Sequence, residues 1–217
     1  MRSLSVKMAK LTHYAKRYSV AFDKFVNAPH MFKRLWEVNS NIKPLQKRQR
    51  VTLVRVIRVM LAAMDAENNQ VGICNTDAMH GITHVNLMKR YKVFFGEPIT
   101  KGRWYRAIKQ LVNAGYLISK SALIINGTDE SPLIRSIASL KEFTKLFFSD
   151  LNLEHKKDIR ESRAKCVASR ISQSRSSIWY GYKIFNKIRK HTKQGHGEPV
   201  TYDEVPSQYQ TCIFSSA

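Results

Sequence analysis

The segment ITKGRWYRAIKQLVNAGYLI, residues 99–118, combines side chains that can hydrogen-bond to DNA. Arginine pairs with guanine, glutamine and asparagine pair with adenine, and lysine binds backbone phosphates. In a helix over 101–114, one arc holds Trp104, Tyr105, Ile108, Leu111 and Val112, and the opposite arc is polar. The predicted DNA contacts are Lys101, Arg103, Arg106, Lys109, Gln110, Asn113 and Lys120. An ordinary amphipathic surface helix is the alternative, because its charges also face solvent.

The net charge of the chain indicates a polyanionic partner. Lysine and arginine number 37 against 16 aspartate and glutamate, which gives +21 and a pI near 10.1. Residues 1–60 hold 14 bases and 2 acids, residues 61–154 hold 11 and 9, and residues 155–197 hold 12 and 2. A nearly neutral centre between basic flanks is expected when a folded module is held on a phosphate backbone. The alternative is that the flanks are solvated and bind no particular partner.

The second basic flank begins with the segment 156–175, which is rich in lysine, arginine and serine. We expect this segment to be solvated or bound to anions. The predicted phosphate contacts are Lys156, Lys157, Arg160 and Arg163. The next segment, 178–190, interleaves aromatic and basic residues, which suits stacking on unpaired bases or packing on the rest of the protein. We favour packing, with Trp179 in the core.

Several classes of protein are disfavoured by the sequence. No apolar run approaches the roughly 20 residues of a membrane span, and the N-terminus lacks the apolar core of an export signal. The cysteines, Cys74, Cys166 and Cys212, form no CxxC pair, so neither a zinc site nor a disulfide framework is predicted. We therefore expect a cytoplasmic protein with reduced thiols and no membrane partner.

Catalytic motifs are also missing. His80 and His84 have i, i+4 spacing, but the glutamate of HExxH is absent and Gly81 weakens a helix there. There is no GxxxxGK[ST] phosphate loop, and no His-hydrophobe-His motif that would accompany a nucleophilic tyrosine. We expect no enzyme activity, no catalytic residue, no metal and no cofactor.

The elements before the DNA-contacting helix follow from periodicity and turn signals. Two short helices interrupted at 27–29 are predicted in residues 1–43, and then a loop over 39–44. A helix over 46–66 follows, with Arg50, Arg55 and Arg58 away from its apolar side. That apolar side holds Leu53, Ile57, Met60, Leu61 and Met64. Residues 70–74 predict a strand, residues 75–79 a small helix ended by Gly81, and residues 85–95 a second helix.

The elements after it complete the expected fold. Thr100 is the predicted N-cap of the DNA-contacting helix and Gly115 the residue beyond its end. Residues 116–125 and 133–137 predict two strands joined by a turn over 126–132. A helix over 140–148 is then expected to bury Leu140, Phe143, Phe147 and Phe148.

This order of elements predicts a mainly α fold with a small β-ribbon, in which a winged helix-turn-helix core carries basic helical extensions. The predicted divisions are a basic helical segment over 1–45, the winged-helix domain over 46–154, a basic helical extension over 155–197 and an acidic-leaning flexible tail over 198–217.

Three stretches carry a resemblance to a known family. The sequences 70-QVGICNTDAMHGITHV-85, 98-PITKGRWYRAIKQLVNAGYLI-118 and 131-SPLIRSIASLKEFTKLFFSDLNLE-154 resemble the central region of RepA-type plasmid replication initiators of the IncFII group. The resemblance covers about residues 50–175 and is one of spacing and residue class. The segment 89–95 differs from the glycine-bearing connection expected there, and no long basic tail follows residue 197. The resemblance implies a divergent or short member that binds a plasmid origin and recruits host replication proteins.

Two functional classes therefore remain open. The first is an origin-binding initiator whose partners are double-stranded DNA and host replication proteins, with oligomerisation possible. The second is a transcriptional regulator with the same winged module, since a fold does not fix a function. The large charge of the flanks favours a protein that covers or bends a long stretch of DNA. RNA binding is a third possibility, but it would require aromatic platforms that the sequence does not define.

Overall fold

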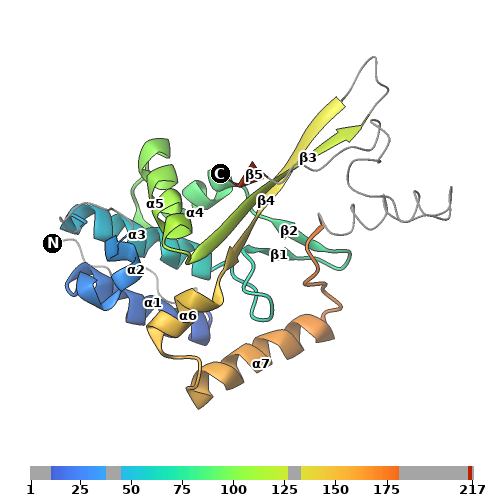
Figure 1. Cartoon of the computed structure of the whole chain (residues 1–217). Coiled ribbons are helices and arrows are strands. Elements are labelled where there is room, and N and C mark those ends of the chain that lie inside the picture. The colour runs from blue at the N-terminus through green and yellow to red at the C-terminus, as the bar shows by residue number, and fades with distance from the viewer. Residues whose placement is uncertain (1–10, 38–44, 127–132, 181–214, 217) are drawn as a thin grey trace, which may run out of the picture.

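The structure, a computed structural model, describes residues 11–37, 45–126, 133–180 and 215–216 (Figure 1). These residues form a mainly helical body with small antiparallel β-sheets, which confirms the predicted fold class at that level. The predicted loop over 39–44 and nearly all of the turn over 126–132 lie outside the described residues. So do residues 181–190 of the aromatic and basic segment, and most of the predicted tail over 198–217.

The N-terminal part is helical and interrupted where the sequence predicts. Helix α1 (His13–Asp23) runs into the short 3-10 helix η2 (Lys24–Val26). A second 3-10 helix, η3 (Pro29–Met31), begins at the proline and leads into α2 (Lys33–Glu37). Proline opens η3 because its fixed φ suits the first turn of a helix and its missing N–H would have no partner there.

Helix α3 (Lys47–Leu61) buries the predicted apolar side, but Arg58 is not on the outside. Its side chain is 1% exposed, and its Nη2 lies 2.8 and 2.7 Å from the two carboxylate oxygens of Asp23. Its Nε also donates to the Ser19 hydroxyl at 2.8 Å. The helical period alone could not predict this burial, because the carboxylate that satisfies the guanidinium belongs to α1.

The centre of the chain contains two helices followed by a long β-hairpin. Helix α4 (His84–Phe95) is capped by the Thr83 hydroxyl and ends at Gly96 with φ +74°. Helix α5 (Lys101–Asn113) follows, and then the antiparallel strands β3 (Leu117–Asn126) and β4 (Leu133–Phe143). A bulge interrupts their register between the pairs Lys120↔Leu140 and Ala122↔Ile137. On the other edge of β3 lies β5 (Ser215–Ser216).

The small helix predicted over 75–79 is wrong. Strands β1 (Gly72–Cys74) and β2 (Met79–Gly81) form an antiparallel hairpin instead, closed by a bond from the Asn75 N–H to the Ala78 carbonyl. A Cβ on Gly72 would lie 2.9 Å from the His80 carbonyl oxygen, so glycine permits the close approach of the two strands. The capping signal at Asn75 and Thr76 therefore belongs to a turn, where the same residue types are also favoured.

The helix predicted over 140–148 is also wrong in its first half. Strand β4 continues to Phe143, which pairs with Leu117, and α6 (Lys145–Leu151) begins after its N-cap Thr144. The four residues expected in the core are all buried. The spacing of these four residues is compatible with a continuous helix and also with a strand followed by a helix. The N-cap Thr144 sets the boundary between the strand and the helix.

Residues 69–71, just before the β1–β2 hairpin, connect the small β1–β2 sheet to the sheet that contains β4. The Val71 N–H donates to the Lys141 carbonyl at 2.7 Å, and the Phe143 N–H donates to the Asn69 carbonyl at 3.0 Å. Gln70 and Glu142 face each other in an antiparallel bridge between these bonds. Residues 69–71 thus lie along the edge of β4, opposite the edge that β3 occupies.

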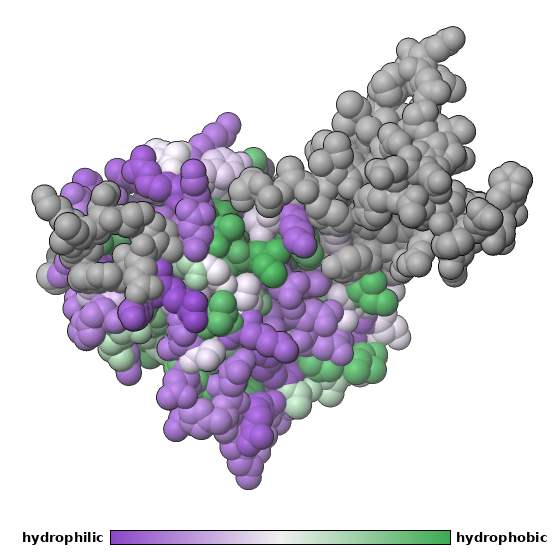
Figure 2. All heavy atoms as spheres, in the orientation of Figure 1, coloured by the Kyte–Doolittle hydropathy of each residue, from purple (hydrophilic) through white to green (hydrophobic). Residues whose placement is uncertain are grey.

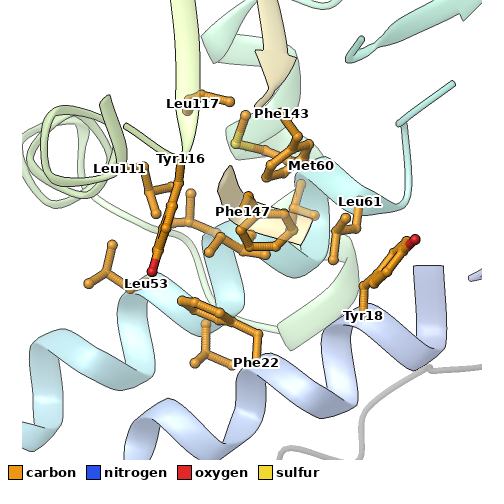
Figure 3. Close-up of a cluster of buried hydrophobic side chains, with 14 of the residues drawn as sticks. Tyr18, Phe22, Leu53, Met60, Leu61, Leu111, Tyr116, Leu117, Phe143 and Phe147 are labelled. Atoms are coloured by element: carbon orange, nitrogen blue, oxygen red, sulfur yellow. The ribbon is translucent and has the colours of Figure 1, made fainter. Parts of the chain in front are cut away.

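One large hydrophobic core includes residues from α1 to α7 (Lys157–Ser172). Tyr18 and Phe22 of α1 pack with residues of α3, α5, β4 and α6 in this core (Figure 3). Aromatic rings meet at its centre, where the ring centroids of Phe143 and Phe147 are 4.8 Å apart and those of Phe22 and Phe147 5.9 Å apart. The described parts of the predicted segments 1–45 and 155–197 therefore share a core with 46–154, and the predicted domain boundaries stay untested.

Helix α7 is held on the body by polar contacts to the loop between α3 and β1. Arg163 donates from Nε to the Ala66 carbonyl at 2.8 Å and from Nη2 to the Asn69 side-chain oxygen at 2.7 Å. Arg170 forms ion pairs with Asp65, whose side chain is 6% exposed, and with Glu67. These polar contacts matter because α7 contributes few side chains to the hydrophobic core: Ile159 is its one fully buried residue.

A second, smaller core lies beyond α7. Trp179 is fully buried against Met79 of β2 and Leu140 of β4, which confirms its prediction as a core residue. The Met79 N–H donates to the Ile178 carbonyl at 2.7 Å, so the chain after α7 runs alongside the β1–β2 hairpin.

Candidate nucleic-acid interface

Helix α5 begins and ends as the sequence predicts. The Thr100 hydroxyl accepts a bond from the Arg103 N–H at 3.4 Å, and Gly115 adopts φ +71° just past the C-terminus. The Gly115 and Tyr116 N–H groups then bond to the carbonyls of Val112 and Leu111. A glycine is suited to this position because residues with a Cβ rarely adopt a positive φ.

Trp104 anchors the buried side of α5. Its side chain is fully buried, and its indole Nε1 donates to Nδ1 of His84, the first residue of α4, at 3.0 Å. Ala107, Ile108 and Leu111 complete the buried side. Tyr105, which we predicted on the same arc, is 47% exposed and lies against the His84 ring instead, so that prediction is wrong.

His84 is held in its neutral form. Because Nδ1 accepts the indole bond, the ring proton lies on Nε2. Burial, with a smaller contribution from the charge of Lys141, lowers the pKa of His84 to about 4. The helical i, i+4 spacing imagined for His80 and His84 is not realised, since His80 lies on β2. Among the described residues, no cluster of three or more histidine, cysteine or acidic side chains could hold a metal.

Lys141, on β4, is fully buried. Its ammonium donates to the carbonyls of Ile82 and Ser139 at 2.8 and 3.1 Å, and to the Ser139 hydroxyl at 2.7 Å. Burial lowers the pKa of Lys141 to about 8, whereas three acceptors favour the charged form. The residue falls within the helix predicted over 140–148, and no signal in the sequence indicated that this lysine is buried.

The outer side of α5 presents the predicted contact residues to solvent. Lys101, Arg103, Arg106, Lys109 and Asn113 are exposed, and Gln110 is half-buried. Within the described part of the chain, none of the four bases forms an ion pair with a carboxylate. Their hydrogen-bond donors are therefore available to an external acceptor. The structure thus brings six of the seven predicted contacts onto one helix.

The seventh predicted contact, Lys120, is separate from the helix. It is exposed and lies on β3, where its backbone pairs with Leu140 on one side and Ser216 on the other.

The N-terminal turns of α3 adjoin the outer side of α5, and the sequence pattern alone did not predict their contribution. A hollow of about 200 Å³ is lined by the N-cap Gln46 and by Arg48, Gln49 and Thr52 of α3, and by Arg103, Arg106, Ala107 and Gln110 of α5. Lys47 and Arg48 are exposed. The run QKRQR at 46–50 was the available signal, but only the fold shows that it faces the same surface as α5.

The four predicted phosphate contacts of α7 are in different situations. Lys156 and Arg160 are exposed, and Lys157 is exposed with Glu161 at 3.8 Å. Arg163, however, is half-buried and bonded to the loop after α3, and its guanidinium lies 5.7 Å from the Phe148 ring centroid. We therefore correct its assignment, because its side chain is half-buried and its Nε and Nη2 already donate within the chain.

The α5 and α7 sets are not brought together. In Figure 1, α5 lies on the upper side of the body and α7 on the lower side, with α1 and α6 between them. The outer surface of α7 is mostly hydrophilic (Figure 2).

The two cysteines within the described residues are unsuited to thiolate chemistry. Burial raises the pKa of Cys74 to about 11, with a further contribution from nearby Asp65, and burial also raises the pKa of Cys166. Both are free thiols. A raised pKa disfavours the nucleophilic or metal-binding thiolate.

Comparisons with known proteins do not extend these observations: no family model matches the chain, and neither a curated protein nor a solved structure matches it significantly. No helix among the described residues combines the length and apolar character that crossing a membrane would require.

Proposed function

We propose that the chain binds double-stranded DNA sequence-specifically, with α5 as the helix that enters the major groove. The observation that carries this proposal is the outer side of α5, on which four bases without carboxylate partners among the described residues stand beside Gln110 and Asn113. Arginine, glutamine and asparagine can form bidentate bonds with base edges in the major groove, whereas lysine mainly neutralises phosphates.

The winged helix-turn-helix interpretation is part of the proposal. Helices α3, α4 and α5 precede the β3–β4 hairpin, and residues 69–71, between α3 and α4, pair with β4. This is the order of elements in a winged helix, with α5 as the recognition helix and β3–β4 as the wing. The hydrogen bond from Trp104 to His84 supports the interpretation, because it fixes α5 on α4.

We further propose that this DNA-binding module serves replication initiation on a plasmid. This step rests on the sequence resemblance to the RepA-type initiators and on the basic flanks, which suit a protein that covers a long stretch of DNA. Transcriptional regulation is the second candidate, because the same recognition helix would serve it.

Footprinting on the DNA that flanks the gene tests both steps. Protection of iterated or AT-rich origin sequence supports the initiator, and protection of a single promoter supports the regulator. Arg106→Ala and Gln110→Ala should each reduce the preference for the protected site over a mutated site by about 1–3 kcal/mol. The matched control, Lys89→Ala with Lys92→Ala, removes two exposed bases of α4 and should leave the preference unchanged. Equal losses of affinity on cognate and random DNA for the α5 variants would contradict sequence reading by this helix.

A further inference from the structure

A second hollow lies beside the first, on the other side of Arg48 and Arg103. It has a volume of about 280 Å³ and lies between one face of α3, Tyr91 of α4, and the turn 97–99 before α5. Arg48, Thr52 and Arg103 line both hollows. The second hollow is therefore continuous with the outer side of α5 but is built mainly from residues that we did not predict as contacts.

The charge of the second hollow is strongly positive. Its lining includes Lys47, Arg48, Arg55 and Arg103, and Glu97 is the acidic residue among them. Glu97 is already used, because its carboxylate pairs with the Arg55 guanidinium. Arg55 also lies over the Phe95 ring at 5.1 Å. Arg55 and Glu97, which form the wall of the hollow, are thus held by their own ion pair. The other three cations, Lys47, Arg48 and Arg103, are exposed and form its rim.

The rim cations come from two helices that meet here. Lys47 and Arg48 belong to α3 and Arg103 to α5, and within the described residues none of them has a carboxylate partner. Like charges held on adjoining elements repel one another, and an anion placed among them removes that repulsion. At the wall, Nε of Arg55 is buried without a hydrogen-bond partner among the described residues.

We propose that this hollow binds a phosphate group. Guanidinium groups match the geometry of phosphate oxygens through paired N–H bonds, and a lysine adds charge without strict geometry. If α5 lies in a major groove, as proposed above, the phosphate is one from the DNA backbone at the edge of that groove. A free phosphate compound offers the same chemistry and is distinguished by experiment.

The decisive variant is Lys47→Gln with Arg48→Gln in the full chain, since both side chains are exposed and lie outside the proposed base-reading set. The matched control is Lys89→Gln with Lys92→Gln on α4, which removes the same charge without lining either hollow. Affinity is measured over a range of salt concentrations on a selected site and on a random duplex. Thermal melting verifies that both variants fold.

For a backbone phosphate, the α3 variant should bind both DNAs about tenfold more weakly than the control variant at about 0.1 M salt. The slope of log affinity against log salt should fall by about 0.9 for each phosphate that the variant no longer neutralises. The ratio of site to random affinity should stay unchanged, because binding to a phosphate carries no sequence information.

Titration with inorganic phosphate at constant ionic strength gives the second arm. If phosphate raises the melting temperature of the wild type but not of the α3 variant, while the two variants bind DNA alike, the occupant is a free phosphate compound. If the α3 variant matches the control in both arms, the hollow is not a phosphate site.

The two proposals fail differently. If the α3 variant matches the control both in salt dependence and in its response to inorganic phosphate, while Arg106 and Gln110 still discriminate between sites, the phosphate hollow alone is overturned. An intact α3 salt effect with no role for Arg106 and Gln110 overturns base reading by α5 and leaves the hollow standing.

Discussion

Helices α5 and α7 are both rich in lysine and arginine, yet the fold uses their charges in opposite ways. On α5 one side is anchored by Trp104, and the bases of the other side have no carboxylate partner in the described parts of the chain. On α7 the arginines at 163 and 170 hold the helix to the loop after α3, and only the remaining bases face solvent. Charge counted along a sequence therefore overstates the charge available to a partner, because an arginine can be a structural residue.

Removing the side chain that anchors α5, Trp104, should have the largest effect on stability. We expect Trp104→Ala to lower the free energy of unfolding by about 3–5 kcal/mol, because it empties a fully buried site and leaves His84 without its indole donor. Chemical denaturation measures this loss. Tyr105→Ala, at the exposed neighbouring position, should cost less than about 1 kcal/mol. Equal costs for the two substitutions would show that Trp104 does not anchor the helix.

Breaking the attachment of α7 should have the next largest effect. Arg163→Met keeps much of the apolar stem but removes the bonds to Ala66 and Asn69, so we expect a loss of about 2–3 kcal/mol in stability. Arg160→Met, one turn earlier and exposed, is the matched control and should be nearly neutral. Similar thermal melts for the two variants would mean that Arg163 is as dispensable to the fold as a surface base.

Lowering the pH should weaken the contact between α4 and α5. The pKa of His84 is about 4 in the folded chain against an ordinary value of 6.5, so its contribution to stability is complete above pH 6.5. It is lost as the pH falls from 6.5 towards 4, by about 1–2 kcal/mol after allowance for partial solvent exposure. His84→Asn should flatten the dependence of stability on pH in this window. An unchanged pH profile in that variant would exclude His84 as the titrating group.

The exposed bases of α7 should give the smallest effect. We expect Lys156→Gln with Arg160→Gln to reduce the salt dependence of DNA binding slightly, without changing stability or site preference, if long DNA reaches this side. Measurements on a short and a long duplex test this, because α5 and α7 lie on the upper and lower sides of the body (Figure 1) and we expect a short duplex on α5 to leave α7 uncovered. A reduced slope on the short duplex would show that α7 belongs to the same contact surface as α5.

The sequence predicted those elements whose signals are local. The caps Thr100 and Gly115 and the β-forming residues of 116–125 were sufficient, because each signal is decided within a few residues. The β1–β2 hairpin was missed because residues favoured at a helix N-cap are also favoured in turns. At the candidate site, the outer side of α5 followed from helical period. The role of Arg48 did not, because it depends on how α3 packs against α5.

The small core around Trp179 has a consequence for the order in which the chain acquires its structure. Met79 and Leu140 precede Trp179 in the chain by 100 and 39 residues, and contacts between residues separated in this way form late and at a cost in chain entropy. Until Trp179 packs against them, the apolar side chains of Met79 on β2 and Leu140 on β4 stay exposed to solvent. A nascent chain halted between β4 and residue 179 should therefore expose apolar side chains that the finished protein buries, which makes this interval of synthesis open to chaperones and to aggregation.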